Sequence, residues 1–235
     1  MNCRILVITD MHYVNAAKHI FKNRARKCEK AKENLELVYQ KTDLGNIDAV
    51  LVLGDTVDNG NAENAAKDLT EIKNLLDKFK KPVISVCGNH DGTLSAFTSV
   101  FDSPDVRMIA GYQFAAFHDT YDGSDNARRD MDKMRRMFEK LNGGVPVIAV
   151  QHNPVFPEIQ SGYPYNLINS TEVCGFYSKN NVMLSISGHY HTGIDISEKD
   201  GVMYITAACF CEEPHTYGIL HLNGKNIIWQ ELCLM

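Results

Sequence analysis

The sequence predicts an α/β protein, because strand-like and helix-like patterns alternate along its first half. Apolar runs at residues 4–9, 49–53 and 82–87 have the length and the β-branched content of buried strands. The segments between them favour helices: residues 15–41 are polar with a partial apolar stripe, and residues 64–79 carry apolar side chains at helical spacing. This β-α-β-α-β order predicts a parallel sheet covered by helices.

The rest of the chain adds more strands than helices. A helix is expected at residues 125–141. The expected strands are residues 106–110, 112–118, 145–150, 182–187, 193–197, 202–207, 216–222 and 227–232. Asp200-Gly201 and Asn223-Gly224 are hairpin-turn signals within the last four. We therefore expect a pair of mixed sheets with helices outside. The length of 235 residues fits one large domain, 1–235.

Composition and charge exclude several classes of protein. The net charge of −5 and the pI of about 6.0 give no electrostatic basis for a stable nucleic-acid partner. No apolar run approaches the length of about 18 residues that a membrane span needs, and no signal-peptide pattern precedes the first strand. The seven cysteines are odd in number and scattered, which indicates reduced thiols in a cytoplasmic protein. The sequence leaves the oligomeric state open.

Five short clusters of metal-ligand residues each follow a predicted strand. They are Asp10-Met11-His12, Gly54-Asp55-Thr56-Val57-Asp58, Gly88-Asn89-His90-Asp91, Gln151-His152 and Gly188-His189-Tyr190-His191. Because neighbouring parallel strands end at a common edge, hydrophobic strands that each end in Asp, Asn or His imply one face where these side chains converge. Nitrogen and oxygen ligands gathered in this way predict a two-metal site, and such sites mostly hydrolyse phosphate esters.

The residue types in these clusters suit transition metals. Asp10 and His12 are two residues apart, so both side chains fall on one side of an extended chain. Asp55 follows a glycine in a turn, where its two oxygens could bridge a pair of ions. The mixture of carboxylate, amide and imidazole groups suits Mn, Fe, Zn or Ni better than Mg or Ca. The clusters contain no cysteine, which argues against a structural thiolate zinc site.

In their order and spacing the clusters resemble the calcineurin-like metallophosphoesterase superfamily. The motifs D-x-H, G-D-x-x-D, G-N-H-D, H and G-H-x-H occur in that order between residues 10 and 191. The resemblance implies a four-layer fold, in which two packed mixed β-sheets are flanked by helices on both outer faces. It also implies two metal sites that share Asp55 as a bridge. Asp10, His12, Asp55 and His191 match the ligands of the first metal, and Asp55, Asn89, His152 and His189 match those of the second.

The same resemblance implies a hydrolysis by in-line attack of a metal-bridging hydroxide on phosphorus. His90 is the motif histidine that is not a metal ligand, and we expect it to stabilise the transition state or to protonate the leaving group. Asp58 is expected to hold His90 oriented and protonated. The first choice of substrate is a phosphodiester, with a cyclic nucleotide as one example. The alternatives are a small phosphomonoester and, in another class, a catalytically silent scaffold of the same fold.

Departures from the family motifs narrow the branch. Phosphoprotein phosphatases carry Arg after the second Asp of G-D-x-V-D-R-G and Glu after G-N-H. Asn59 and Asp91 take those places here, which counts against that branch. Purple acid phosphatases need Tyr where this chain has Asp58. The group that remains is the small phosphodiesterases and phosphomonoesterases.

Three further features have both a functional and a packing interpretation. His118-Asp119 either lies near the site or forms a satisfied pair in a turn, and the second is favoured. For Cys209-Phe210-Cys211, packing is favoured over a third metal site. The stretch of residues 18–32 has seven Lys or Arg against one Glu, and a solvated helix face is favoured over a rim that steers anions.

Residues 153–171 leave directly from His152 and carry several aromatic side chains. They form either a packed surface loop or a platform on which a base or an aryl leaving group stacks. The substrate depends on which rings of Tyr163, Tyr165, Phe210 and Tyr217 face the metals. An aromatic slot there would favour nucleotides.

Overall fold

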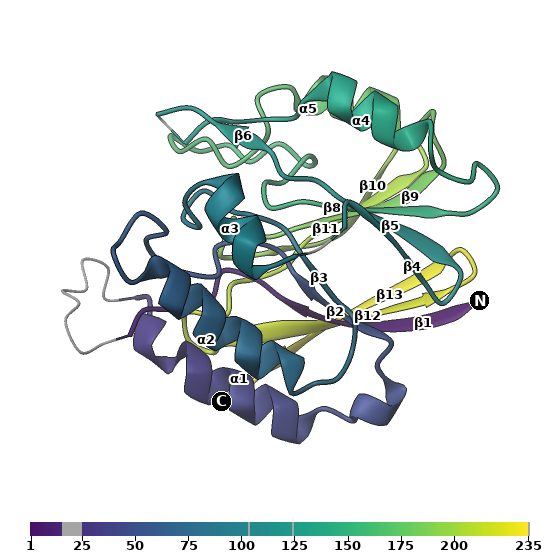
Figure 1. Ribbon diagram of the computed structural model, residues 1–235. Coiled ribbons are helices and arrows are strands. Elements are labelled where there is room, and N and C mark those ends of the chain that lie inside the picture. Colours follow the sequence, from purple (N-terminus) through teal and green to yellow (C-terminus); the bar gives the residue numbers. More distant parts are fainter. Residues whose placement is uncertain (16–24, 103, 124, 235) are drawn as a thin grey trace.

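The computed structural model describes residues 1–15, 25–102, 104–123 and 125–234, which contain two large β-sheets (Figure 1). The first sheet has five strands in the order β13-β12-β1-β2-β3. They are β1 (Asn2–Ile8), β2 (Ala49–Val52), β3 (Val83–Ser85), β12 (Thr216–Asn223) and β13 (Asn226–Cys233). β1, β2 and β3 run parallel, as the β-α-β-α-β pattern predicted, and the hairpin β12–β13 joins them antiparallel.

The second sheet has six strands in the order β10-β11-β9-β8-β5-β4. They are β4 (Val106–Ile109), β5 (Tyr112–Ala116), β8 (Val147–Val150), β9 (Val182–Ser187), β10 (Ile194–Lys199) and β11 (Val202–Thr206). The four inner strands are parallel, and the edge strands β4 and β10 are antiparallel to their neighbours. A separate small ribbon pairs β6 (Thr120–Tyr121) with β7 (Ala127–Arg128). Both large sheets are therefore mixed, as expected.

The main helices cover the two outer faces (Figure 1). α1 (Ala31–Lys41), α2 (Ala65–Asp77) and α3 (Leu94–Val100) pack against the first sheet, and α4 (Met131–Phe138) and α5 (Ser170–Tyr177) cover the second. Three hydrophobic clusters separate the layers, one under each set of helices and one between the sheets. The chain thus has the four-layer arrangement that the resemblance implied.

Strand β1 illustrates how the sequence builds these layers. Leu6 and Ile8 lie in the hydrophobic cluster beneath α1 and α2, whereas Ile5 and Val7 point between the two sheets. All four side chains are buried. Because successive strand residues face opposite sides, a strand that is buried on both faces is apolar at every position. The runs that precede the ligand clusters are continuous and hydrophobic for this reason.

The helices are less well predicted than the strands. The helix expected at 15–41 is shorter in the structure: α1 begins at Ala31 after a 3₁₀ turn, Cys28–Lys30, and residues 25–27 are not helical because Arg26 forms an isolated bridge with Glu212. Residues 16–24 of that prediction lie outside the described residues. The helix expected at 125–141 begins only at Met131, because β7 precedes it and the Asp130 side chain caps its first turn at Lys133 N (2.8 Å). Neither α3 nor α5 was predicted. These helices have seven and eight residues, too short for periodicity to identify, and tertiary packing stabilises them.

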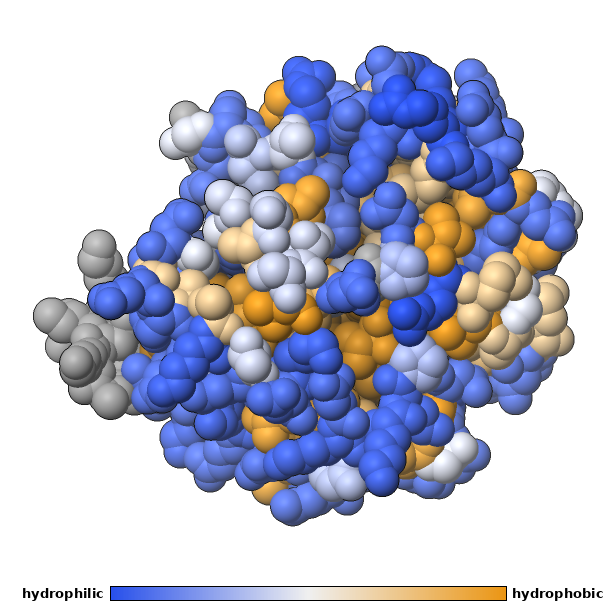
Figure 2. Space-filling model, viewed as in Figure 1, coloured by the Kyte–Doolittle hydropathy of each residue, from blue (hydrophilic) through white to orange (hydrophobic). Residues whose placement is uncertain are grey.

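The surface is mostly polar, with hydrophobic residues gathered across the middle of the view in Figure 2, between the two helical layers. Among the described residues, no helix combines the length and the apolar character that crossing a membrane requires.

Candidate metal centre

The strand ends converge as expected. β1, β2 and β3 of the first sheet lead into Asp10, Asp55 and Asn89, and β8 and β9 of the second sheet lead into the other ligand-type residues, His152, His189 and His191. Main-chain and side-chain hydrogen bonds join these loops: Asp10 N donates to Gly54 O (3.1 Å), Gly188 N to His152 O (3.0 Å) and His189 N to Asp10 Oδ2 (2.9 Å). The last bond connects the two sheets.

Four of the seven predicted ligands have left-handed backbone conformations. The φ angles of Asp10, His12, Asp55 and His189 are 50°, 45°, 49° and 67°. Non-glycine residues rarely adopt this region, and such strain persists where surrounding contacts fix it, most often at functional sites. The main chain therefore turns sharply where each of these side chains enters the cluster.

Two motif glycines, Gly54 and Gly188, are needed at their positions for different structural reasons. Gly54 has a φ of 94°, so it permits the turn that precedes Asp55, as expected. Gly188 does not need a positive φ. A Cβ at Gly188 would overlap Thr9 Oγ1 and Asp10 Oδ2, so this glycine is required by close packing of the loop after β9 against the loop after β1.

Asp55 lies at the centre of the cluster. Its Oδ2 is 3.5 Å from His12 Nε2 and 3.4 Å from His152 Nε2. Its Oδ1 accepts a hydrogen bond from His90 N (2.8 Å), which fixes the carboxylate plane. One carboxylate oxygen thus faces imidazoles on both sides, which is the position that a bridging ligand occupies.

Asp10 completes the side of the cluster that contains His12 and His191. Its Oδ2 accepts from Thr9 Oγ1 (2.6 Å) and from His189 N, and its Oδ1 lies 3.5 Å from His191 Nε2 and 3.9 Å from His12 Nε2. The donor atoms of Asp10, His12 and His191 lie within 4.8 Å of one another. This spacing would let them bind one ion.

The other side of the cluster contains His152, His189 and Asn89. His152 Nδ1 donates to Leu53 O (2.7 Å), which leaves Nε2 as the free ring nitrogen, 3.2 Å from Asn89 Oδ1. Donor atoms of Asp10, Asp55, His152 and His189 lie within 4.8 Å of one another. The two sets therefore adjoin: Asp10 belongs to both, and Asp55 Oδ2 lies between His12 and His152.

The donor atoms fit cations. Asp10 Oδ1, His12 Nε2 and His189 Nε2 are buried and have no hydrogen-bond partner, and the first two lie 3.9 Å apart inside the cluster. Buried polar atoms are nearly always paired, so a group of unpaired carboxylate and imidazole atoms indicates a binding site for a cation. The same donor set suits divalent transition metals.

Electrostatics favour the ligand forms of the two carboxylates and of His189. Burial acts to raise the pKa of Asp10 and Asp55, but hydrogen bonds and charges of the neighbouring histidines hold both below their ordinary range. Burial lowers the pKa of His189 to about 3, so this imidazole is neutral and can bind a cation. Burial also acts to lower the pKa of His152, but Asp55 raises it to about 9. A cation bound there displaces a proton.

His90 and Asp58 are paired differently from the expectation. His90 Nδ1 donates to the main-chain carbonyl of Asp58 (2.7 Å), and the His90 ring packs edge-on against His12 at 4.6 Å between centroids. The Asp58 carboxylate lies 3.3 Å from His12 Nδ1 and 3.1 Å from the Arg26 guanidinium. Burial acts to raise the pKa of Asp58, but His12, His90 and Arg26 bring it down to about 2. Asp58 therefore orients His90 through its main chain and His12 through its side chain.

Arg26 was not predicted as a site residue. Asn59 stands where the phosphoprotein-phosphatase branch carries Arg, yet a guanidinium from the stretch 18–32 reaches the neighbouring Asp58. Residues 18–24 of that stretch lie outside the described residues. The only sequence signal was the density of basic residues soon after Asp10-Met11-His12.

Asp91 and Glu212 accept hydrogen bonds that hold the candidate ligand residues in position. Asp91 Oδ1 accepts from Thr56 N (2.7 Å) and Val57 N (3.1 Å), and its Oδ2 accepts from Gly88 N (2.9 Å). This buried carboxylate thus joins the loops that present Asp55 and Asn89. Glu212 Oε1 accepts from His191 Nδ1 (2.8 Å), so His191 presents Nε2 to the cluster.

Cys209 and Cys211 lie beside the same histidine. Cys209 N donates to His191 O (3.0 Å) and Cys211 N to Asp10 O (3.1 Å), and both thiols are buried. Donor atoms of these two cysteines, His191 and Glu212 lie within 4.8 Å of one another. The C-x-C segment thus packs directly behind a predicted ligand.

The remaining candidates have packing roles. Asp119 forms a buried ion pair with Arg129, with Oδ1–Nε at 2.5 Å and Oδ2–Nη2 at 3.1 Å, which agrees with the favoured interpretation of this strand end. Phe210 and Tyr217 are buried in the core beneath α1 and α2. Tyr163 and Tyr165 instead lie against His189, with ring centroids 5.6 and 5.5 Å from its imidazole.

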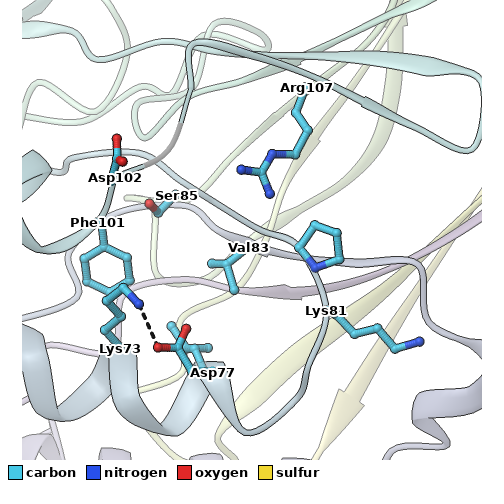
Figure 3. Close-up of a pocket in the computed structure, with 10 residues that line it drawn as sticks. Lys73, Asp77, Lys81, Val83, Ser85, Phe101, Asp102 and Arg107 are labelled. Carbon is cyan, nitrogen blue, oxygen red and sulfur yellow. Dashed lines mark hydrogen bonds and ion pairs between the residues drawn. The ribbon is translucent and has the colours of Figure 1, made fainter.

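A cavity of about 220 Å³ lies away from these ligands, among α2, β3 and β4 (Figure 3). Its charged side chains include Lys73, which pairs with Asp77 at 2.7 Å, and Arg107. None of the residues that line it belongs to the predicted site. The cavity therefore does not compete with the cluster as a metal centre.

The fold and the Asp/His cluster support a metal-dependent phosphoester hydrolase. The sequence profile of calcineurin-like phosphoesterases matches residues 3–193. The chain belongs to the calcineurin-like phosphoesterase family. Membership of this family and the Asp/His cluster together support the binding of two metal ions. No curated protein matches the sequence significantly.

Solved structures share the fold at low sequence identity. A dimetal phosphatase from Danio rerio is 15% identical over 97% of this chain and 95% of its own, with a TM-score of 0.79. A purple acid phosphatase from yellow lupin seeds is 11% identical over 99% of this chain and 52% of its own, with a TM-score of 0.66. The phosphopantetheinyl hydrolase of Mycobacterium tuberculosis is 15% identical over 88% of this chain and 90% of its own, with a TM-score of 0.55.

Proposed function

We propose that this protein is a two-metal phosphodiesterase. The observation that supports the two-metal site most strongly is the group of buried donor atoms around Asp55, among which Asp10 Oδ1 and His12 Nε2 have no hydrogen-bond partner. In this proposal two ions share Asp55. Asp10, His12 and His191 complete the first ligand set, and Asn89, His152 and His189 complete the second. Mn, Fe and Zn suit these ligands.

When bound, the two ions supply activation of the attacking water and neutralise charge on the phosphate oxygens. The protein positions the rest of the reaction. His90 has its Nδ1 occupied by Asp58 O, so its Nε2 is the ring nitrogen available to a leaving-group oxygen. His90 thus protonates the leaving group or stabilises its developing charge. Asp58 acts as a positioning residue for His90 and His12.

A phosphodiester is favoured over a monoester by the charge around the site. The guanidinium that reaches it, Arg26, is 3.1 Å from the ionised Asp58 carboxylate, so its charge is largely neutralised. A monoester dianion gains most from an unpaired cation beside the metals. A diester carries a single negative charge and does not depend on such an additional cation.

We further propose that residues 1–235 form one domain that works in the cytoplasm. The seven cysteines are free and six of them are buried, which suits a reducing compartment. The substrate is then a small intracellular phosphodiester.

The test is turnover by the metal-reconstituted protein of p-nitrophenyl phosphate, bis(p-nitrophenyl) phosphate and a cyclic nucleotide, measured in parallel. We expect the diesters to have the higher kcat/KM. Faster hydrolysis of the monoester would assign the protein to the phosphomonoesterases. No turnover of any substrate by protein with two bound ions would instead support a silent binding scaffold.

A further inference from the structure

Three tyrosines border the second ligand set. Tyr165 lies at the centre, with its ring centroid 4.9 Å from Tyr163, 4.9 Å from Tyr190 and 5.5 Å from the imidazole of His189. We call Tyr163, Tyr165 and Tyr190 the tyrosine wall. Tyr190 comes from the G-H-Y-H motif itself, whereas the other two come from the segment that follows His152.

The wall presents ring surface to solvent. Tyr163 is 36% exposed, and Tyr165 and Tyr190 are half-buried. Phe210 and Tyr217, the other aromatic residues expected near the site, are buried in the core. Aromatic surface left open beside a metal cluster is available for a planar ligand, because ring faces stack on bases and aryl groups.

Hydrogen bonds fix the wall in place. The buried Asn153 donates from Nδ2 to Tyr165 O (2.9 Å) and accepts at Oδ1 from Tyr121 OH (2.8 Å). The Asn166 side chain donates to Pro157 O (2.9 Å). The Tyr163 hydroxyl donates to Asp125 Oδ2 (3.2 Å). The rings are therefore preorganised, so a ligand that stacks on them loses little binding energy to the ordering of side chains or loops.

The wall and His90 flank different ligand sets. His90 packs against His12, whereas Tyr163 and Tyr165 pack against His189, whose imidazole is 4.7 Å from that of His152. In the proposed mechanism the leaving-group oxygen of a phosphate bound between the two sets would face His90. The side of the tyrosines is then free for the substituent that stays on phosphorus.

We propose that the tyrosine wall binds a planar aromatic group, of which a nucleobase is the main example, on the non-leaving side of a phosphodiester. This inference rests on the proposed phosphodiesterase function and names its substrate class. The product would be an aromatic phosphomonoester, such as a nucleotide, and the released alcohol would leave past His90.

Two diesters with the same leaving group test the wall. Thymidine 5′-(p-nitrophenyl phosphate) retains a nucleobase, and ethyl p-nitrophenyl phosphate retains an alkyl group. The metal-loaded protein is expected to prefer the thymidine ester in kcat/KM. In Tyr165→Leu this preference should fall about tenfold or more, because base stacking on one ring is lost. Tyr165→Phe, which retains the ring, should keep the preference, and Tyr39→Leu, on α1, is the surface control.

Equal losses for both esters in Tyr165→Leu would overturn the proposal, because the ring would then act on the shared leaving group or on folding. If the wild-type protein hydrolyses neither ester, the proposed phosphodiesterase function is wrong, and that result does not test the tyrosine wall. Calorimetric binding of thymidine 5′-phosphate to the metal-loaded protein still tests the wall in that case. The wall predicts about tenfold weaker binding by Tyr165→Leu, and unchanged binding would exclude it.

Discussion

At the scale of single residues, three histidines of the site, His12, His152 and His191, present the same ring nitrogen to the cluster. Nδ1 of His152 is occupied by Leu53 O and Nδ1 of His191 by Glu212, and His12 Nδ1 faces Asp58. Carbonyl and carboxylate partners on Nδ1 fix the tautomer and leave Nε2 as the ligand atom. The second layer of contacts thus decides which atoms can bind metal.

Replacing Glu212 tests this second layer. Glu212→Ala removes the acceptor from His191 Nδ1, so the imidazole loses both its orientation and part of its basicity. We expect metal affinity to fall by about 10- to 100-fold, measured by competition with a chelating dye. Glu213→Ala, at the neighbouring exposed position, is the matched control. Unchanged affinity in Glu212→Ala would show that the hydrogen bond is incidental.

His90 tests the catalytic assignment. His90→Asn should keep two metal ions per chain, because His90 belongs to neither ligand set, while kcat falls by about 10²- to 10⁴-fold. His221→Asn changes a histidine that pairs with Asn2 at the other end of β1 and should have no such effect. A His90→Asn protein with nearly full activity would remove His90 from the mechanism.

At the scale of elements, the strands were predictable and the supporting contacts were not. Residues 5–8 and 49–52 are apolar at every position because both faces of the strand are buried there, so the sequence reveals these strands. Glu212 acts through a partner that the chain brings to it only on folding, and no local pattern marks it. Asp91 lies in the G-N-H-D motif and Arg26 in a basic stretch, but their contacts with the loops after β2 and β3 and with Asp58 depend on folding. Sequence motifs therefore indicate the candidate ligands but not the contacts that orient them.

Gly188 connects the loops after β1 and β9. In Gly188→Ala the new Cβ overlaps Thr9 Oγ1 and Asp10 Oδ2, so the loops must separate. We expect loss of tight metal binding, seen as fewer than two retained ions per chain by elemental analysis. Gly175→Ala in α5 meets no neighbouring atom and should stabilise the protein or leave it unchanged. Wild-type metal content in Gly188→Ala would contradict the close-approach argument.

The buried ion pair fixes the elements around α4. Arg129 contacts Asp119, the Tyr177 hydroxyl (2.8 Å) and the face of Phe117 (3.9 Å). Arg129→Met leaves the Asp119 charge buried and unpaired, so we expect a loss of about 3–5 kcal/mol in the free energy of unfolding. Urea denaturation measures it, with Arg128→Met on the exposed side of β7 as control. A loss no larger than the control's would show that Asp119 is not held as a buried charge.

At the scale of the whole molecule, the site exists because two sheets bring their strand ends together. The first sheet supplies carboxylate and amide groups together with His12, and the second supplies only imidazoles. Hydrogen bonds from His189 N to Asp10 Oδ2 and from His152 Nδ1 to Leu53 O join the two. The net charge of −5 does not favour anionic substrates overall, so attraction has to come from the bound ions themselves.

The central claim is that two ions, sharing Asp55, make this fold a phosphodiesterase. The most direct measurement titrates Mn²⁺ into chelator-stripped protein and follows bis(p-nitrophenyl) phosphate hydrolysis against bound metal per chain. We predict that activity rises with the second equivalent, reaches its maximum near two ions per chain, and is absent in Asp55→Ala. Full activity at one ion, or hydrolysis that persists without metal, would contradict the account.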